Sequence, residues 1–136
     1  MAHKRTDIRN ALKAMLTDTT DAQDKVYVNR PYNIDKAKLP AIHIYDESET
    51  IGTRDIGAAR FLRKITTKID LLVTGSTQVD TDLDDLAKQV EDIINADRRL
   101  QATCSSAIYQ GIDTTFEVGE KSVGKATLTY EITYLT

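Results

Sequence analysis

The sequence predicts an α+β fold, a two-layer sandwich in which two helices pack on one face of a mixed, mostly antiparallel sheet of about five strands. Two observations predict it. Apolar residues recur at helical spacing in two segments, whereas several other segments alternate between apolar and polar residues, as strands with one buried face do. In chain order these segments give α-β-β-β-α-β-β. At 136 residues the chain fits one domain, and we expect residues 1–136 to form a single one.

The first helix is expected over residues 6–17. Apolar side chains there recur every three or four residues and form one stripe, which consists of Ile8, Ala11, Leu12, Met15 and Leu16. Thr6 or Asp7 would cap the start of the helix by accepting a hydrogen bond from a free backbone N–H. The polar residues 18–24 then connect this helix to the first strand.

Three strands are expected between the two helices. A short one covers residues 26–28 and ends before Pro31, because proline cannot donate a hydrogen bond to a neighbouring strand. The next follows Pro40 over residues 41–45. The third is marked by clear alternation over residues 65–73.

Residues 46–60, between the second and third of these strands, are expected to form a long loop. The segment carries both charges, two glycines and few apolar side chains. Hairpin loops of this length are unusual and are often functional. Two interpretations stay open: a solvated hairpin tip, or an interface that becomes ordered against a neighbouring subunit. The second assigns the contact to six charged residues, namely Asp46, Glu47, Glu49, Arg54, Asp55 and Arg60.

The second helix is expected after a break at residues 75–77. Its apolar stripe consists of Val79, Leu83, Leu86, Val90, Ile93 and Ile94. Two further strands are expected at residues 108–118 and 124–136. The last strand alternates without a break, and its apolar face consists of Ala126, Leu128, Tyr130, Ile132 and Tyr134.

Composition excludes several classes of function. The net charge is −3, and Lys and Arg are mixed with Asp and Glu throughout, so no basic stripe indicates sequence-specific binding of nucleic acid. No apolar run approaches the roughly 18 residues that would span a membrane, and we expect no membrane partner. The N-terminal residues lack the apolar segment of a secretory signal, and the single Cys104 excludes an internal disulfide. Both points favour synthesis in the cytoplasm.

Four aspartates crowd the start of the second helix: Asp80, Asp82, Asp84 and Asp85. Negative charge at this position stabilises the helix dipole, and we favour this structural interpretation. The alternative is an exposed Mg²⁺ or Ca²⁺ site built on Asp82, Asp84 and Asp85, because hard cations take several carboxylate oxygens. The glycine and the terminal glutamate of an EF-hand are absent. A small divalent-metal-dependent enzyme is the function that this alternative would support.

No set of catalytic residues is evident in the sequence. His43 lies in mid-strand on the polar face with Tyr45, and no Ser or Cys motif accompanies it. Cys104 has no nucleophile signature and is expected to pack as a small apolar residue. Phosphate-binding, dinucleotide-binding and zinc-protease motifs are also missing. We therefore expect no catalytic residue, no required cofactor and a protein that is not an enzyme.

Four short motifs follow one another along the chain. They are His3 with Thr6-Asp7-Ile8-Arg9, then Asn29-Arg30-Pro31 after a short aromatic strand, then Leu39-Pro40-Ala41-Ile42, and finally Leu128-Thr129-Tyr130-Glu131-Ile132-Thr133-Tyr134. Together with the element order between them, they cover essentially the whole chain. In these respects the sequence resembles the tail terminator proteins of long-tailed bacteriophages, the lambda-type minor tail protein U family.

The resemblance implies a structural virion protein. It implies a homo-oligomeric ring, hexameric in its working state, that caps the tail tube and stops the tube protein from polymerising. The ring would offer a surface to head-completion proteins at the head-proximal end of the tail, after assembly in the host cytoplasm. Assembly assisted by Mg²⁺ or another divalent cation is also implied. Another head–tail connector or tail-completion subunit is the alternative within the same class.

Overall fold

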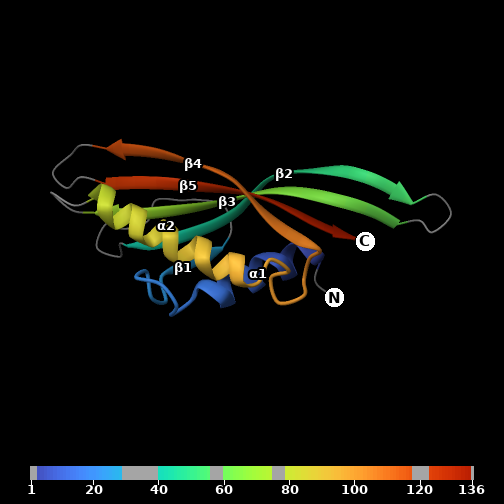
Figure 1. The fold of residues 1–136 in the computed structure, drawn as a ribbon, viewed down its shortest axis with the longest axis horizontal. Helices are drawn as coiled ribbons and strands as arrows, with labels where there is room; N and C mark the ends of the chain where they lie inside the picture. Colours follow the sequence, from blue (N-terminus) through green and yellow to red (C-terminus); the bar gives the residue numbers. More distant parts are fainter. Residues whose placement is uncertain (1–2, 29–39, 56–59, 75–78, 118–122, 136) are drawn as a thin grey trace.

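The computed structural model describes residues 3–28, 40–55, 60–74, 79–117 and 123–135. Its elements follow the predicted order (Figure 1): α1 (Lys4–Leu16), β1 (Val26–Val28), β2 (Ala41–Asp55), β3 (Arg60–Thr74), α2 (Val79–Ala96), β4 (Ser106–Glu117) and β5 (Val123–Leu135). The fold class predicted from the sequence is therefore confirmed. No helix among these residues is long and apolar enough to cross a membrane.

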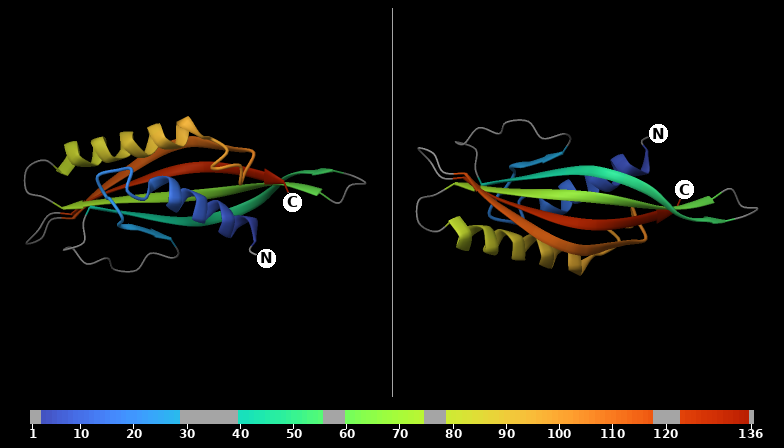
Figure 2. Two further views of the ribbon diagram at one scale, coloured as in Figure 1. Left: turned by 90° about the horizontal axis from the view of Figure 1, so that it is seen from below. Right: turned by 90° about the horizontal axis from the view of Figure 1, so that it is seen from above.

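One open sheet of five strands forms the first layer. Its order is β1-β2-β3-β5-β4, with β1 parallel to β2 and every other neighbouring pair antiparallel. Both helices pack on the same face and form the second layer, α1 over the β1–β2 half and α2 over β3 and β5 (Figure 2). The core lies between the layers, and the opposite side of the sheet is called the outer face below.

α1 starts two residues earlier than predicted because His3 caps it. Nδ1 of His3 accepts a hydrogen bond from the backbone N–H of Arg5 at 3.1 Å, so neither Thr6 nor Asp7 is the cap. The predicted apolar stripe is confirmed. All of its side chains are buried: Ile8, Ala11, Leu12, Met15 and Leu16.

α2 and β5 approach each other closely at Gly124. A Cβ at this position would lie 2.3 Å from Cγ1 of Val79 and 2.8 Å from Cδ1 of Leu83, so glycine is what lets the start of α2 lie this near the sheet. Beyond Gly124, β5 alternates as predicted. Its side chains toward the helices are all buried: Ala126, Leu128, Tyr130, Ile132 and Tyr134.

The prediction of a long loop at residues 46–60 is wrong. β2 continues to Asp55 and β3 begins at Arg60, so these strands form one long hairpin. Its far end extends beyond the other strands (Figure 1). Apolar alternation is missing there for two reasons. Register shifts after Asp46 and Ile51 interrupt the pleat. Neither of the two described helices covers the projecting end, so neither face has to be apolar.

β4 forms one edge of the sheet. It begins at Ser106, two residues before the predicted start, and ends at Glu117. Within the described part of the chain it pairs only with β5. A register shift between Tyr109 and Gly111 leaves Gln110 outside the ladder, as in a β-bulge.

Candidate functional site

Two carboxylates of β2 connect α1 to the sheet, and the first is Glu49. It accepts a hydrogen bond from the Tyr134 hydroxyl and forms ion pairs with Arg5 at 3.4 Å and Arg63 at 3.3 Å. Burial and the hydrogen bond to Glu49 raise the pKa of Tyr134 to about 12. The Glu49 side chain is only 15% exposed, so its charge is compensated mainly within the subunit.

Asp46 is the second of these carboxylates. It accepts a hydrogen bond from Oγ1 of Thr67 at 2.9 Å and forms an ion pair with Arg9. Arg5 and Arg9 lie four residues apart, and hence on the same side of α1. Asp46 and Glu49 therefore hold that side of α1 against β2. A further contact of either residue with a neighbouring subunit stays a prediction.

The other four predicted interface residues lie elsewhere on the hairpin. Glu47 is 57% exposed and lies 3.5 Å from Nζ of Lys68. Arg54 and Asp55 end β2, Arg60 begins β3, and Asp55 stands opposite Arg60 in the register. The side chains of these last three residues lie outside the described part of the structure. Their role between subunits is thus a prediction that the fold permits but does not test.

α2 spreads the predicted metal ligands around its axis. Asp82, Asp84 and Asp85 are all exposed. Residues two apart on a helix differ by about 200° in direction, so Asp82 and Asp84 lie on different sides of α2. Among the residues that the structure describes, no three His, Cys, Asp or Glu side chains gather so that they could hold a metal ion. Asp80 and Asp82 occupy the first turn, where carboxylates favour the helix dipole.

A polar cluster lies on the outer face of the sheet around Asp70, which is 2% exposed. Its carboxylate accepts a hydrogen bond from Oγ1 of Thr127 at 2.7 Å and lies 3.5 Å from Nζ of Lys125. Burial raises the pKa of Tyr45, and the charge and hydrogen bond of Asp70 raise it further. His43 stands opposite Asp70 in the register, with its ring 5.9 Å from the Tyr45 ring. These contacts give the buried carboxylate a structural role.

Cys104 is buried in the core, as predicted. Burial raises its pKa to about 11, and its Sγ lies 3.6 Å from the carbonyl oxygen of Arg98. Because the thiolate is the nucleophilic form, a thiol that stays neutral at physiological pH is a poor nucleophile.

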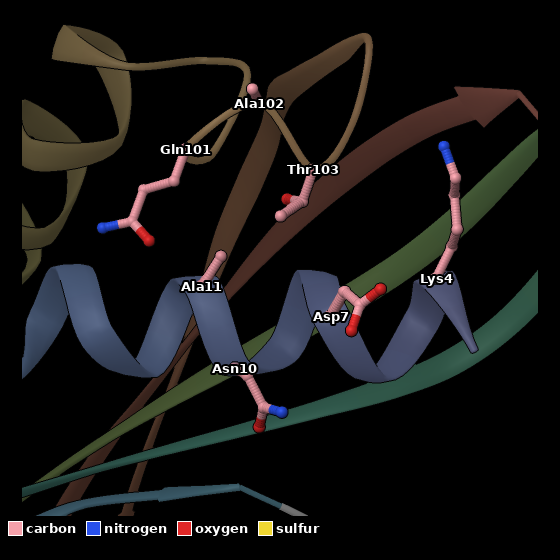
Figure 3. Close-up of a pocket in the computed structure, with 7 residues that line it drawn as sticks. All are labelled: Lys4, Asp7, Asn10, Ala11, Gln101, Ala102 and Thr103. Carbon is pink, nitrogen blue, oxygen red and sulfur yellow. The ribbon is translucent and has the colours of Figure 1, made fainter. Parts of the chain in front are cut away.

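A groove of about 450 Å³ lies between α1 and the turn after α2 (Figure 3). Its lining residues are Lys4, Asp7, Asn10, Ala11, Gln101, Ala102 and Thr103. The turn contains three consecutive residues with positive φ, which is uncommon for residues other than glycine: Leu100, Gln101 and Ala102. The lining offers one amine and one carboxylate but no histidine or thiol, so it contains no recognisable nucleophile and base.

The sequence matches the model of a known protein family. The family model of phage minor tail protein U matches residues 3–134, nearly the whole chain. The chain belongs to the phage minor tail protein U family. None of the curated proteins matches it. The resemblance inferred from the four motifs is confirmed. As a member of the phage minor tail protein U family, it is a structural protein of the phage tail and interacts there with other tail or virion components.

The roles of several residues that shape these surfaces were not predicted from the sequence. Arg5, Arg9 and Tyr134 fix α1 to β2, and the spacing of Arg5 and Arg9 was the available signal for the first two. Alternation placed Tyr134 on the buried face but could not indicate its partner. The exposed apolar side chains of β4 were not predicted either, because alternation does not indicate which strand lies at the edge of a sheet.

Proposed function

We propose that this protein is a tail terminator. It forms a homo-oligomeric ring, hexameric in its working state, that caps the tail tube and stops the tube protein from polymerising. The observation that carries the proposal is the match to the phage minor tail protein U family over residues 3–134. Among the elements that the structure describes, a match of this extent includes α1 to β4 completely and β5 up to Tyr134.

The architecture supports a ring of identical subunits. A ring needs two different, complementary surfaces on each copy, because each copy contacts one neighbour through each surface. The sheet of this protein has two unlike edges, β1 with β2 on one side and β4 on the other. Such a subunit is suited to head-to-tail association.

The ring has two further partners in this proposal. The tail tube protein binds one of its faces, and a head-completion or connector protein binds the other at the head-proximal end of the tail. Assembly takes place in the host cytoplasm. No cofactor is required, and assistance by Mg²⁺ or another divalent cation remains a prediction.

The test is to add the purified protein to a polymerising reaction of the tube protein and to measure tube lengths by electron microscopy. Tubes should stop growing, with a ring at one end. A Gly124→Val variant, in which α2 cannot lie on β5, serves as the matched control and should leave growth unchanged. Tubes that grow equally long with the wild-type protein would exclude the terminator role. Binding to head particles without binding to tubes would instead indicate another connector or completion subunit.

A further inference from the structure

Large apolar side chains are exposed near both edges of the sheet. β4 exposes Ile108 (50%), Tyr109 (37%) and Ile112 (43%), and β2 exposes Ile51 (46%). In the described part of the chain, β4 pairs only with β5, and β2 beyond Ile44 pairs only with β3. An edge strand with exposed apolar side chains associates readily with another chain, and natural proteins usually protect such edges with charge. These two edges are therefore candidates for contact between chains.

The two helices beside these edges carry opposite charges. α2 contains six acidic residues and one basic residue, whereas α1 contains four basic residues and one acidic residue. α1 covers the β1–β2 half of the sheet and α2 covers the other half (Figure 2). The two helices thus differ in the sign of their charge, and complementary charge of this kind directs association and fixes orientation.

One side of α2 faces β4. α2 lies beside β4 (Figure 2), and the Glu91 carboxylate is close enough to the Tyr109 hydroxyl to raise its pKa, so Glu91 lies on the side of α2 toward this strand. Asp84 and Asp80 precede Glu91 by seven and eleven residues, which puts them on the same side of the helix. Both are exposed, and neither has an ion-pair partner among the described residues. The acidic side of α2 is thus next to β4, where Tyr109 and Ile112 pair with inward positions of β5 and Ile108 pairs with the outward Glu131.

One side of α1 faces β2. Arg5, Arg9 and Lys13 follow at intervals of four residues, and the first two reach Glu49 and Asp46. Lys13 is exposed and has no ion-pair partner within the described part of the chain. The basic side of α1 therefore lies next to the β2 edge.

We propose that the α2–β4 edge of one copy binds the α1–β2 edge of a second copy of the same chain. Asp80 and Asp84 then approach the basic side of α1, and Ile108, Tyr109 and Ile112 are covered. The contact joins two different surfaces, so it repeats from copy to copy and closes into a ring when the rotation allows. This inference rests on the proposed ring and specifies which surfaces build it.

The test compares two pairs of substitutions in α2 that change the charge equally. Asp80→Lys with Asp84→Lys reverses the side toward β4, and Asp82→Lys with Asp85→Lys changes the other sides of the same helix. Oligomer formation is measured by sedimentation velocity and electron microscopy over a range of concentrations. The first pair should raise the concentration for half-maximal assembly about tenfold or more, because like charges then face each other. The second pair should assemble nearly as the wild type does.

A compensating change identifies the partner surface. Adding Lys13→Glu to Asp80→Lys with Asp84→Lys should recover part of the assembly, whereas Lys13→Glu alone should weaken it. Thermal unfolding shows whether each variant is folded. If the first pair is unfolded, Ile108→Lys, at an exposed position of β4, takes its place with the same expectation.

The outcomes separate this inference from the proposed function. A wild-type chain that forms no oligomer and does not cap tubes contradicts the terminator role itself. A wild-type chain that forms rings while both α2 pairs assemble equally well, or equally poorly, overturns the edge-to-edge contact and leaves the terminator role standing.

Discussion

Tyr130 and Tyr134 both occupy inward positions of β5 but differ in what their hydroxyl groups contact. The Tyr134 hydroxyl donates a hydrogen bond to Glu49, which also forms ion pairs with Arg5 and Arg63. The Tyr130 hydroxyl is buried with no hydrogen-bond partner in the described structure. The hydroxyl group therefore stabilises the fold at Tyr134, where it donates a hydrogen bond, but not at Tyr130.

This difference predicts opposite effects of one substitution. Tyr134→Phe removes a hydrogen bond to a charged group and should lower the free energy of unfolding by about 1.5–3 kcal/mol. Tyr130→Phe removes a hydroxyl that is buried without a partner and should leave the stability unchanged or raise it by up to about 1 kcal/mol. Urea unfolding of both variants, followed by circular dichroism, measures the two values. Equal losses in both variants would contradict the different surroundings assigned to the two hydroxyl groups.

The sequence was informative about which residues of this region are charged and which are buried, but not about their partners. The charges of Asp46 and Glu49 suggested an interface between subunits. In the structure these carboxylates contact Arg5 and Arg9, about forty residues earlier in the chain. Contacts over such distances depend on how α1 lies on the sheet, and spacing within one segment does not carry that information.

At the level of elements, α2 depends on one position of β5. The first turn of α2 can approach the sheet because Gly124 has no side chain, and Val79 and Leu83 fill that space. A β-branched residue such as Val79 has few alternative rotamers with which to make room.

Gly124→Ala should therefore destabilise the fold by about 1–3 kcal/mol through overpacking. Thermal or urea unfolding measures this loss. A double-mutant cycle with Val79→Ala tests the cause, since the smaller side chain provides room for the new methyl group. The combined variant should lose less stability than the sum of the two single changes. Strictly additive losses would contradict the direct contact.

Element order and the buried faces were predictable because periodicity records which side of an element is covered. The alternation of β5 and the stripes of α1 and α2 are examples. Their predicted apolar side chains are buried, except that Ile93 of α2 is half-buried and packs against the core. The far part of the β2–β3 hairpin was not predicted. It projects beyond the other strands, so neither of its faces is covered and its sequence shows no apolar alternation. The cap of α1 was also missed, since His3 performs a role that Ser, Thr, Asp or Asn more often performs.

For the whole molecule, the tyrosines determine how stability depends on alkaline pH. The pKa values of Tyr109 and Tyr134 are each raised to about 12, chiefly by burial and then by their contacts with Glu91 and Glu49. The pKa of tyrosine in an unfolded chain is about 10. Because the folded values are higher, the associated stability is fully present below pH 10 and is lost as the pH rises toward 12.

Urea unfolding at a series of pH values checks this expectation. The part of the urea midpoint concentration that depends on neutral tyrosine side chains should stay constant up to about pH 10 and then decrease toward pH 12. Lysine side chains also lose their charge in this range, so the informative comparison is with Tyr134→Phe. Its midpoint should decrease less steeply than that of the wild type. Parallel curves for the two proteins would contradict the assigned pKa shift.

The place of β5 in the sheet has a consequence for the order in which the molecule can fold. β5 lies between β3 and β4 in space but follows both in the chain. While the ribosome synthesises the chain, β4 emerges with no neighbouring strand available, and β3 lacks one of its two partners. The five-stranded sheet can be completed only after residues 123–135 have left the exit tunnel. Until then the apolar side of α2, which packs on β3 and β5, has an incomplete surface to cover, and the nascent subunit cannot present both of its edges to another copy.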